Sequence, residues 1–363
     1  MRIYIITGEK SGDLHASNLV KVLQRQNNQI VFRAFGGENL RSNGVEIARD
    51  IKDLAFMGFK EVVQNLYSIK ENLDFCKQDI LKFNPDILIL VDYAGFNLKV
   101  ARFAKSKKIK TIYYIPPKVW AWNYKRIYSI KKYIDKVLAI FPFEEEIYKK
   151  HNIDVTYVGN PLINEIKDQK FSFDYKTNKK IIALLPGSRK QEIQHILPLM
   201  LDVVNDFPEY QFVLAGTDAC SKEYYNSLIG DKPVDIVYNQ TYSLLSHAHV
   251  ALVTSGTATL ETALFNVPQV VCYKTSLISY IIAKLFIKIK YISLVNILMN
   301  RLVVEELIQT ELNRSNLISS LNKILKIETR QEILNNYNQL HNILKQEQTT
   351  KNLADIILSS PHK

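Results

Sequence analysis

The chain has 363 residues, of which 47% are hydrophobic and 23% are charged, and its 47 Lys and Arg against 36 Asp and Glu give a net charge of +11. This composition is typical of a globular protein and excludes a disordered chain, while the length predicts roughly two domains. The three cysteines lie far apart, which excludes a disulfide scaffold and a CxxC metal or redox motif.

Short β-branched and aromatic runs alternate along the chain with longer helical patterns. The predicted strands are 2–7, 30–35, 86–91, 110–115, 136–140, 155–158, 181–185, 211–215, 235–237, 250–253 and 269–273, and the predicted helices include 13–26, 60–83, 97–107, 192–206 and 257–265. The strand runs are continuously apolar, as in parallel strands that are buried on both faces. The alternation predicts an α/β fold of doubly wound parallel sheets.

The polar segment 167–180 has no apolar periodicity and is predicted to link two Rossmann-like domains, 1–166 and 167–363. The last helices, at about 328–363, are expected to pack back either on the first domain or on a partner chain. Ligands of doubly wound sheets bind at the carboxyl ends of strands. We therefore expect the functional motifs to follow strands and to face a central cleft.

The first such motif, TGEKSGD at 7–13, follows the first strand and opens a helix. Gly8 and Gly12 permit a tight turn and a close ligand approach, and Asp13 is a candidate N-cap. The spacing fits neither the GxGxxG fingerprint nor a Walker A loop. Glu9 is unusual, because a carboxylate in a glycine turn at a strand end is often functional. An ordinary strand–helix turn is the alternative.

The second motif, DYAGFN at 92–97, follows a strongly apolar strand. The carboxylate of Asp92 at that strand end can act as a general base or bind sugar hydroxyls. Capping of the next helix is the alternative.

Residues 102–136 carry eleven Lys or Arg and one acid, Asp135, a balance of 11 − 1 = +10. Such a block predicts an anionic partner, which is a nucleic acid, a membrane surface or a phosphorylated substrate. The segment 114–122 in this block holds both tryptophans. They either line a sugar or acyl site or pack the domain.

The third motif, LPGSRKQE at 185–192, follows the first strand of the second half. Gly187 and Ser188 leave backbone N–H groups free at a helix start, and Arg189 adds a guanidinium fork. This combination suits a diphosphate, with a structural turn as the alternative.

The fourth motif, TSGTATLE at 254–261, again places small hydroxyl residues between a strand and a helix. It is typical of a second phosphate cradle, and Glu261 can accept hydrogen bonds from both ribose hydroxyls. A capped helix with a buried small-residue face is the alternative.

Two apolar stretches, 54–59 with the helix that follows and 276–290, are typical of membrane-surface segments, with buried core helices as the alternative. No uninterrupted apolar run is long enough to span a membrane, and the N-terminus has no secretory signal, so we expect a cytoplasmic protein. His247 and His249 are attributed to packing at a strand start, and no metal site is predicted.

Taken together, the motifs resemble those of the lipid-A-disaccharide synthase family, inverting glycosyltransferases of the GT-B type. The resemblance covers residues 8 to about 311 and rests on the order and spacing of GEKSGD, MGFKEV, NPDILILVDYAGFN, YYIPPKVWAW, FPFEEEIY, YVGNPL, LLPGSRKQEI, TSGTATLE and YISLVNIL. It implies transfer of 2,3-diacylglucosamine from its UDP-sugar to 2,3-diacylglucosamine 1-phosphate, without a cofactor. UDP leaves, and a β-1,6-linked disaccharide forms at the cytoplasmic face of the inner membrane.

The resemblance also implies the site residues. On the donor side these are Ser188, Arg189, Ser255, Gly256, Thr257, Glu261 and Asn296, and on the acceptor side Glu9, Ser11, Gly12 and Asp13. Many family members carry a second aspartate in the loop after the third predicted strand, and Gly95 replaces it here. We therefore predict Asp92 as the general base, with Glu9 and Asp13 as alternatives.

Three other functions are alternatives. A peripheral membrane scaffold without catalysis is disfavoured by the motifs on both sides of the expected cleft, and two alternatives remain. One is a different UDP-GlcNAc-dependent GT-B enzyme, such as an epimerase or a GlcNAc transferase, and the other is a basic nucleic-acid-binding α/β protein. No nucleic-acid-binding module is recognisable, so we predict no nucleic-acid partner. The order of the motifs favours peripheral contact with an anionic membrane together with an acceptor that carries a 1-phosphate. A homodimer is left open.

Overall fold

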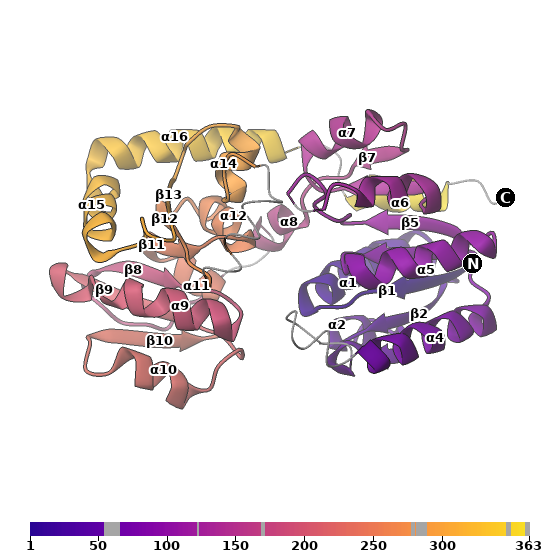
Figure 1. The fold of residues 1–363 in the computed structure, drawn as a ribbon, viewed down its shortest axis with the longest axis horizontal. Coiled ribbons are helices and arrows are strands. Elements are labelled where there is room, and N and C mark those ends of the chain that lie inside the picture. The colour runs from indigo at the N-terminus through magenta and orange to yellow at the C-terminus, as the bar shows by residue number, and fades with distance from the viewer. Residues whose placement is uncertain are drawn as a thin grey trace. The chain divides into compact units, whose positions relative to one another are not determined.

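The computed structural model describes residues 1–53, 66–121, 123–167, 171–276, 280, 289–345 and 350–359. The chain divides into two compact units (Figure 1). Unit 1 comprises Met1–Pro161 and Gln346–Lys363, and unit 2 comprises Leu162–Lys345. Among the helices in the described ranges, none combines the length and the hydropathy that a membrane-spanning segment requires.

The described residues of unit 1 form a seven-stranded parallel sheet with the order β3-β2-β1-β4-β5-β6-β7. Its strands are β1 (Arg2–Ile6), β2 (Val31–Gly36), β3 (Glu46–Asp50), β4 (Ile87–Val91), β5 (Lys110–Tyr114), β6 (Lys136–Ala139) and β7 (Val155–Tyr157). The order reverses between β1 and β4, which pair with each other. Ligand sites of doubly wound sheets lie at such a switch point, outside the carboxyl ends of the strands.

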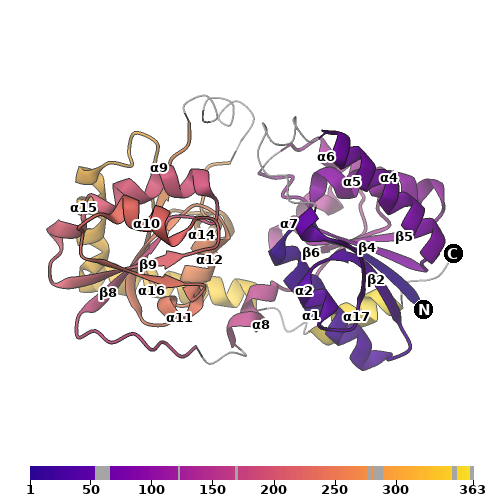
Figure 2. The ribbon, with the colours of Figure 1, turned by 90° about the horizontal axis from the view of Figure 1, so that it is seen from below.

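Helices cover both faces of this sheet. They are α1 (Lys10–Gln26), α2 (Glu38–Arg41), the 3-10 helix η1 (Ile51–Asp53), α4 (Leu66–Phe83), α5 (Ala94–Ser106), α6 (Arg126–Tyr133), α7 (Pro142–Lys149) and α17 (Thr350–Leu358). Figure 2 shows α4, α5 and α6 on one side of the sheet and α1 and α17 on the other. Because both faces are covered, every residue of β4 is buried.

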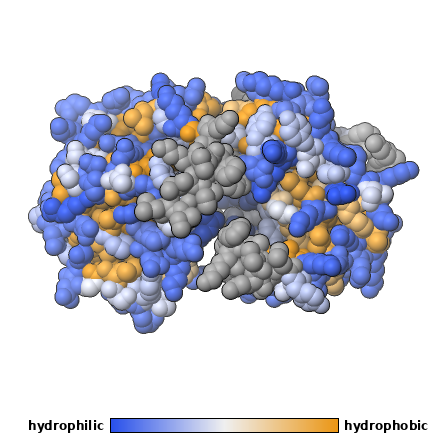
Figure 3. All heavy atoms as spheres, viewed as in Figure 1, coloured by the Kyte–Doolittle hydropathy of each residue, from blue (hydrophilic) through white to orange (hydrophobic). Residues whose placement is uncertain are grey.

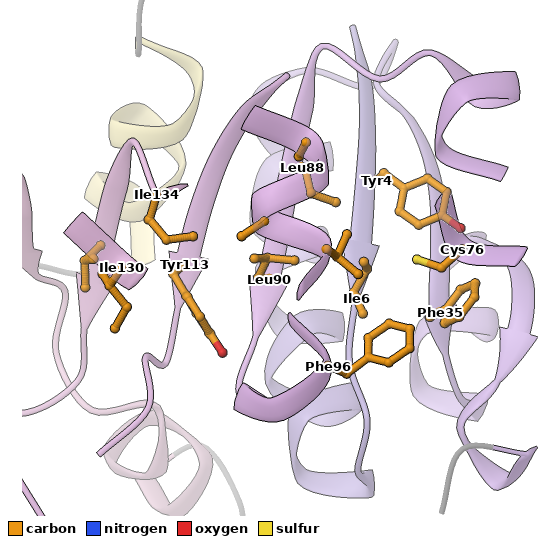
Figure 4. Close-up of a cluster of buried hydrophobic side chains, with 14 of the residues drawn as sticks. Tyr4, Ile6, Phe35, Cys76, Leu88, Leu90, Phe96, Tyr113, Ile130 and Ile134 are labelled. Atoms are coloured by element: carbon orange, nitrogen blue, oxygen red, sulfur yellow. The ribbon is translucent and has the colours of Figure 1, made fainter. Parts of the chain in front are cut away.

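The side chains between the sheet and α4–α6 form one hydrophobic cluster (Figure 4). Its members include Tyr4, Ile6, Phe35, Cys76, Leu88, Leu90, Phe96, Tyr113, Ile130 and Ile134. These side chains come from strands on both sides of the switch point, so the cluster fixes β1 and β4 relative to α4, α5 and α6.

Unit 2 repeats the architecture with six described strands, all parallel, in the order β10-β9-β8-β11-β12-β13. The strands are β8 (Lys180–Leu185), β9 (Tyr210–Gly216), β10 (Val234–Tyr238), β11 (Ala248–Thr254), β12 (Gln269–Tyr273) and β13 (Glu305–Ile308). The helical elements are α8 (Pro161–Lys167), which begins at the unit boundary, α9 (Lys190–Leu201), η2 (Val204–Asp206), α10 (Lys222–Ile229), α11 (Thr241–Leu245), α12 (Thr257–Leu264), α14 (Leu294–Met299), α15 (Arg314–Leu325) and α16 (Ile327–Leu344). Its switch point lies between β8 and β11.

The predicted class of doubly wound parallel sheets is confirmed, and each predicted strand matches an observed one to within two residues at either end. Two edge strands, β3 and β13, were not predicted. Both strands are short and carry charged residues, as edge strands of natural sheets often do. The charged residues interrupt the apolar runs from which the other strands were predicted. The helix predicted at 192–206 is wrong beyond Leu201, where α9 ends, and a separate 3-10 turn follows at Val204–Asp206.

The unit boundary falls between Pro161 and Leu162, a few residues before the predicted one. At the C-terminal end, α16 belongs to unit 2, whereas α17 belongs to unit 1 and packs on α1. Gln26 Nε2 donates a hydrogen bond to Asp355 Oδ1 at 2.8 Å in that contact. The apolar stretch 54–59, the predicted helix start at 60–65 and most of 276–290 lie outside the described residues.

A buried carboxylate connects β1, β2 and α4. Asp79 of α4 accepts hydrogen bonds from Tyr4 Oη at 2.6 Å and from Arg33 Nε and Nη2 at 2.8 Å each. Burial alone would raise the pKa of Asp79, but the bonds from Arg33 and Tyr4 outweigh it and lower the pKa. The ionised form is therefore the one that the fold stabilises.

We expect Asp79→Asn to lower the free energy of unfolding of unit 1 by about 3 kcal/mol at neutral pH, because Arg33 then lacks its buried partner. The wild-type advantage should disappear as the pH falls below about 4, where the carboxylate is protonated in the unfolded chain. Both tryptophans of the chain belong to unit 1, so urea denaturation followed by tryptophan fluorescence measures this unit. Asp74→Asn, an exposed carboxylate on the same helix that pairs with Lys77, is the control and should cost less than about 1 kcal/mol.

Candidate functional site

In unit 1 the turns after β1 and β4 touch each other at the switch point. A Cβ built on Gly8 would lie 2.2 Å from Cγ of the Tyr93 ring, so only glycine fits there. Glu9 follows as the N-cap residue of α1 and is half-buried. Burial, and then the negative charge of Glu9, raise the pKa of Tyr93. The structure thus brings the two predicted acidic motifs of unit 1 together.

The other residues of the first motif lie in the first turn of α1. Ser11 is exposed at this end of the helix, whereas Gly12 is buried. A Cβ built on Gly12 would lie 3.5 Å from Thr7 Cβ and 3.9 Å from Val91 Cγ1, which are ordinary van der Waals distances, so the space at this position does not require glycine.

Asp13 was predicted as the N-cap of α1, and this is wrong because the helix begins at Lys10. The buried carboxylate of Asp13 instead accepts hydrogen bonds from the backbone N–H of Gly37 at 2.6 Å and of Asn39 at 2.9 Å. Those amides belong to the N-terminus of α2, which has no side-chain cap of its own. Asp13 thus ties α1 to the end of β2.

Asp92 occupies the carboxyl end of β4 in a strained backbone. Asp92 and Tyr93 both have φ of 47°, in the left-handed region that non-glycine residues rarely adopt. Two side chains hold this conformation by donating to the Asp92 carbonyl oxygen, Asn97 Nδ2 at 2.7 Å and Tyr113 Oη at 2.6 Å. The half-buried Asp92 carboxylate makes no hydrogen bond to any residue that the structure describes.

A further carboxylate, Glu144 in the first turn of α7, is almost completely buried. It accepts hydrogen bonds from Trp120 Nε1 at 3.0 Å and from the backbone N–H groups of Ile140 and Phe141 at 3.3 and 3.2 Å. Burial raises its pKa to about 7, against the lowering effect of these donors and of Lys118. Glu144 was not predicted as a site residue, although a Glu at the third position of a helix is a known capping signal.

The loop after β5 carries Lys118 and Trp120 into this neighbourhood. Desolvation lowers the pKa of Lys118, while Asp92 and Glu144 both act to raise it, so the ammonium group lies within the field of both carboxylates. The Trp120 ring packs edge-on against Phe143, with ring centroids 5.1 Å apart. Trp120 is thus a packing residue of this loop, and Trp122 lies outside the described residues.

In unit 2 the turn after β8 presents Ser188 and Arg189 at the start of α9, and both residues are exposed. Gly187 has φ of 128°, and a Cβ there would lie 2.5 Å from Glu192 Oε2, so glycine is required. Glu192 accepts from the Ser188 N–H at 3.2 Å and from Arg189 Nη1 at 3.0 Å. This exposed ion pair is weak, so the guanidinium can exchange Glu192 for an anionic ligand.

The turn after β11 lies beside it, because β8 and β11 pair as parallel neighbours. Ser255 Oγ donates to the carbonyl oxygen of Ile292 at 2.9 Å. Gly256 has φ of 145° and no atom within 4 Å of a Cβ built on it, and the exposed Thr257 begins α12. The first N–H groups of a helix have no partner within it and attract anions. The two predicted phosphate motifs therefore meet at one edge of the sheet.

Glu261 and Asn296 differ in what they can offer to a ligand. Glu261, in α12, is half-buried and forms a hydrogen bond with Tyr242 of α11. Asn296 is fully buried, and its side-chain amide donates to Val304 O and Glu306 Oε1, each at 2.8 Å, while its oxygen accepts from two backbone N–H groups. The donors and the acceptor of this amide are therefore used within the protein, and the side chain holds the loops around the site in place.

The two histidines of the predicted strand start are placed by local packing. His249 in β11 stacks on Tyr210 with ring centroids 6.4 Å apart, and His247 Nδ1 lies 2.9 Å from Ser246 Oγ. Within the part of the chain that the structure describes, no three His, Cys, Asp or Glu side chains converge as a metal site would require.

Comparison with known proteins identifies relatives over nearly the whole chain. A family model described as lipid-A-disaccharide synthetase matches residues 3–359. Lipid-A-disaccharide synthase 1 of Legionella pneumophila strain Lens is 36% identical, over 99% of this chain and 97% of that protein. Among solved structures, the UDP-GlcNAc 2-epimerase of Neisseria meningitidis bound to UDP-GlcNAc has a TM-score of 0.67 at 14% identity and covers 99% of both chains. The glycotransferase of kitacinnamycin has a TM-score of 0.66 at 13% identity, over 99% of this chain and 98% of that one. The two structures show the GT-B fold class.

The raised pKa of Glu144 makes a prediction about stability. The folded state holds the proton more tightly than the unfolded chain, so this contribution is complete below about pH 4.5 and is lost as the pH rises through about 7. Relative to Glu144→Gln, which cannot titrate, the wild type should lose on the order of 2–3 kcal/mol of its free energy of unfolding as the pH rises across this interval. Urea denaturation at successive pH values measures this loss.

Glu145 is the matched control with the opposite sign. Burial would raise its pKa, but the N–H of Tyr157 and the ammonium of Lys149 lower it, so its contribution is lost as the pH falls. A parallel pH dependence for Glu144→Gln and Glu145→Gln would contradict the assignment.

Proposed function

The chain belongs to the lipid-A-disaccharide synthase family, and we propose that it transfers 2,3-diacylglucosamine from its UDP-sugar to 2,3-diacylglucosamine 1-phosphate. It is a glycosyltransferase of lipid A disaccharide formation. In the proposed reaction the acceptor 6-hydroxyl attacks the anomeric carbon of the donor, the bond from that carbon to the diphosphate breaks, and UDP leaves. The family matches do not favour the epimerase or the nucleic-acid-binding alternative.

The observation that carries the assignment of sites is the pair of turns at the neighbouring carboxyl ends of β8 and β11. In our proposal the donor diphosphate lies against Ser188, Arg189, Ser255, Gly256 and Thr257. The exposed Arg189 and the N-termini of α9 and α12 supply positive charge where negative charge develops on the departing UDP. Glu261 binds the ribose hydroxyls, and Asn296 fixes the loop beside the donor.

The acceptor, in this proposal, lies at the switch point of unit 1. Asp92 removes the proton from the attacking hydroxyl, because its carboxylate is half-buried and its backbone is held by Asn97 and Tyr113. Glu9, the neighbouring carboxylate, and Ser11 orient the sugar, while Asp13 and Gly12 hold the turn that presents them. Gly95 is exposed and open, so its position leaves room for the acceptor.

We expect Asp92→Asn to lower kcat at least about a hundredfold, as loss of a general base does, and to change the KM for the donor less than about threefold. Product formation is measured by mass analysis of the tetra-acyl disaccharide phosphate. Asp86→Asn is the matched control, because Asp86 lies just before the other end of β4 and its carboxylate accepts only the Arg2 N–H among the described bonds. Near-wild-type turnover by Asp92→Asn would contradict the assignment of Asp92 as the general base.

We also propose that the protein docks peripherally on the cytoplasmic face of an anionic inner membrane. The supporting feature is the α6 surface, which comprises Tyr124, Lys125, Tyr128, Lys131 and Lys132. The two tyrosines are 48% and 60% exposed, and the three lysines are exposed. Interfacial tyrosines and basic side chains together favour the headgroup region. Hydrophilic residues predominate on the face of the molecule in Figure 3, with smaller hydrophobic patches between them.

The double variant Lys131→Glu/Lys132→Glu should reduce partition to phosphatidylglycerol-containing vesicles at least about tenfold at low salt, and added salt should weaken wild-type binding. Vesicle sedimentation measures both effects. Lys326→Glu/Lys345→Glu, with the same charge change on exposed positions of unit 2, is the control. Equal loss in the two double variants would contradict a local docking surface. Sedimentation equilibrium tests the homodimer that the sequence leaves open.

A further inference from the structure

A short turn of unit 2, Tyr291–Leu294, lies against the loop that we assign to the donor diphosphate. The carbonyl oxygen of Ile292 accepts the hydrogen bond from Ser255 Oγ at 2.9 Å, and the N–H of Leu294 donates to Thr259 Oγ1 at 3.1 Å. Thr259 Oγ1 in turn donates to the Gly256 carbonyl oxygen at 2.8 Å. The first turn of α12 is therefore tied to this turn through two hydroxyl groups.

One carboxylate holds the same turn from the other side. Glu306 Oε2 accepts from the N–H of Ile292 at 2.9 Å, and Oε1 accepts from the N–H of Ser293 at 2.9 Å and from Asn296 Nδ2 at 2.8 Å. Bonds of this type, from N–H groups to an ionised carboxylate, are roughly twice as strong as bonds between neutral groups. Glu306 belongs to β13, so the turn is attached to the edge of the sheet.

Asn296 completes the attachment. Its side-chain oxygen accepts from the N–H groups of Val303 and Val304 at 2.7 and 3.0 Å, and its Nδ2 donates to Val304 O. Ser293 Oγ accepts from the Asn296 N–H at 3.2 Å and caps α14. The turn, α14 and the start of β13 are thus joined through Glu306 and Asn296, and the first turn of α12 is hydrogen-bonded to the same turn.

We propose that Glu306 is a positioning residue for the donor diphosphate, because its carboxylate holds the Ile292–Ser293 backbone that orients Ser255 and the N-terminus of α12. The proposal rests on the proposed function of the β11–α12 turn as the diphosphate site. Because Ser255 has committed its hydroxyl hydrogen to Ile292 O, the contribution of this turn to phosphate binding includes the backbone amides at the start of α12, and their direction depends on this attachment.

Glu306→Gln replaces one carboxylate oxygen by an N–H donor, so one of the two backbone N–H groups loses its acceptor and faces another donor. We expect the Kd for UDP, measured by calorimetry without acceptor or membrane, to rise at least about tenfold. The KM for the donor should rise similarly, and the KM for the acceptor should change less than about twofold. Unit 1 is unaffected by this change, so the pH dependence of turnover should be that of the wild type.

The neighbouring Glu305 supplies the matched control. It lies on the same strand, and its carboxylate pairs with Lys323 at 3.8 Å on the surface. Glu305→Gln should therefore leave UDP affinity unchanged. Unchanged UDP affinity in Glu306→Gln, whatever its melting temperature, would overturn the proposal. Equal losses in the two variants would do the same.

Two further measurements separate the possible failures. If wild-type protein does not bind UDP, the proposed function of the β11–α12 turn fails, whereas the positioning proposal fails only if wild type binds and Glu306→Gln binds equally well. Should Glu306→Gln not fold, Glu306→Asp keeps the charge with a shorter reach and is measured instead. In a double-mutant cycle with Ser255→Ala, the losses in UDP affinity should be clearly less than additive, because both substitutions release the same turn. Additive losses would overturn the proposal.

Discussion

Burial of both faces of the two parallel sheets is the constraint on which the rest of the structure depends. Because helices cover each face, the central strands carry mostly apolar side chains, as β4 shows with five buried residues in a row. Most polar groups near the candidate sites therefore lie in the turns that follow the strands, and Glu306 of the edge strand β13 is an exception. The reversal of strand order, at β1 and β4 in unit 1 and at β8 and β11 in unit 2, brings two such turns side by side.

A second common feature is that carboxylates accept hydrogen bonds from backbone N–H groups in turns at or near helix N-termini. Asp13 accepts two backbone N–H groups at α2, Glu144 accepts two at α7 and the Trp120 indole, and Glu306 accepts two at the turn before α14. A carboxylate suits this task because its two oxygens can accept several bonds at once, and helix N-termini offer unpaired N–H groups. Acidic residues near the candidate sites therefore divide into those that accept backbone N–H groups and those, such as Asp92, whose carboxylate makes no hydrogen bond to a described residue.

The sequence could predict the features that depend on neighbours along the chain. Apolar runs located the buried strands, and glycine with hydroxyl residues after a strand located both turns of unit 2. Glu306 escaped prediction because nothing in the local pattern EELI distinguishes it from Glu305, and only the folded chain brings Ile292 to one of them and Lys323 to the other. The internal hydrogen bonds of Asn296, which was predicted to meet the donor, escaped prediction for the same reason, since its partners Val303 and Val304 lie beyond a loop.

Unit 1 is discontinuous along the chain, and this bears on the order in which the protein is made. Unit 2 is a single continuous segment. The helix α17 of unit 1 follows unit 2 in the sequence and packs on α1, with Leu353, Ala354 and Ile357 buried. On a ribosome, the segment that completes unit 1 emerges after every residue of unit 2. The half of the protein that is translated first is therefore the half that finishes folding last, with one side of α1 uncovered until then.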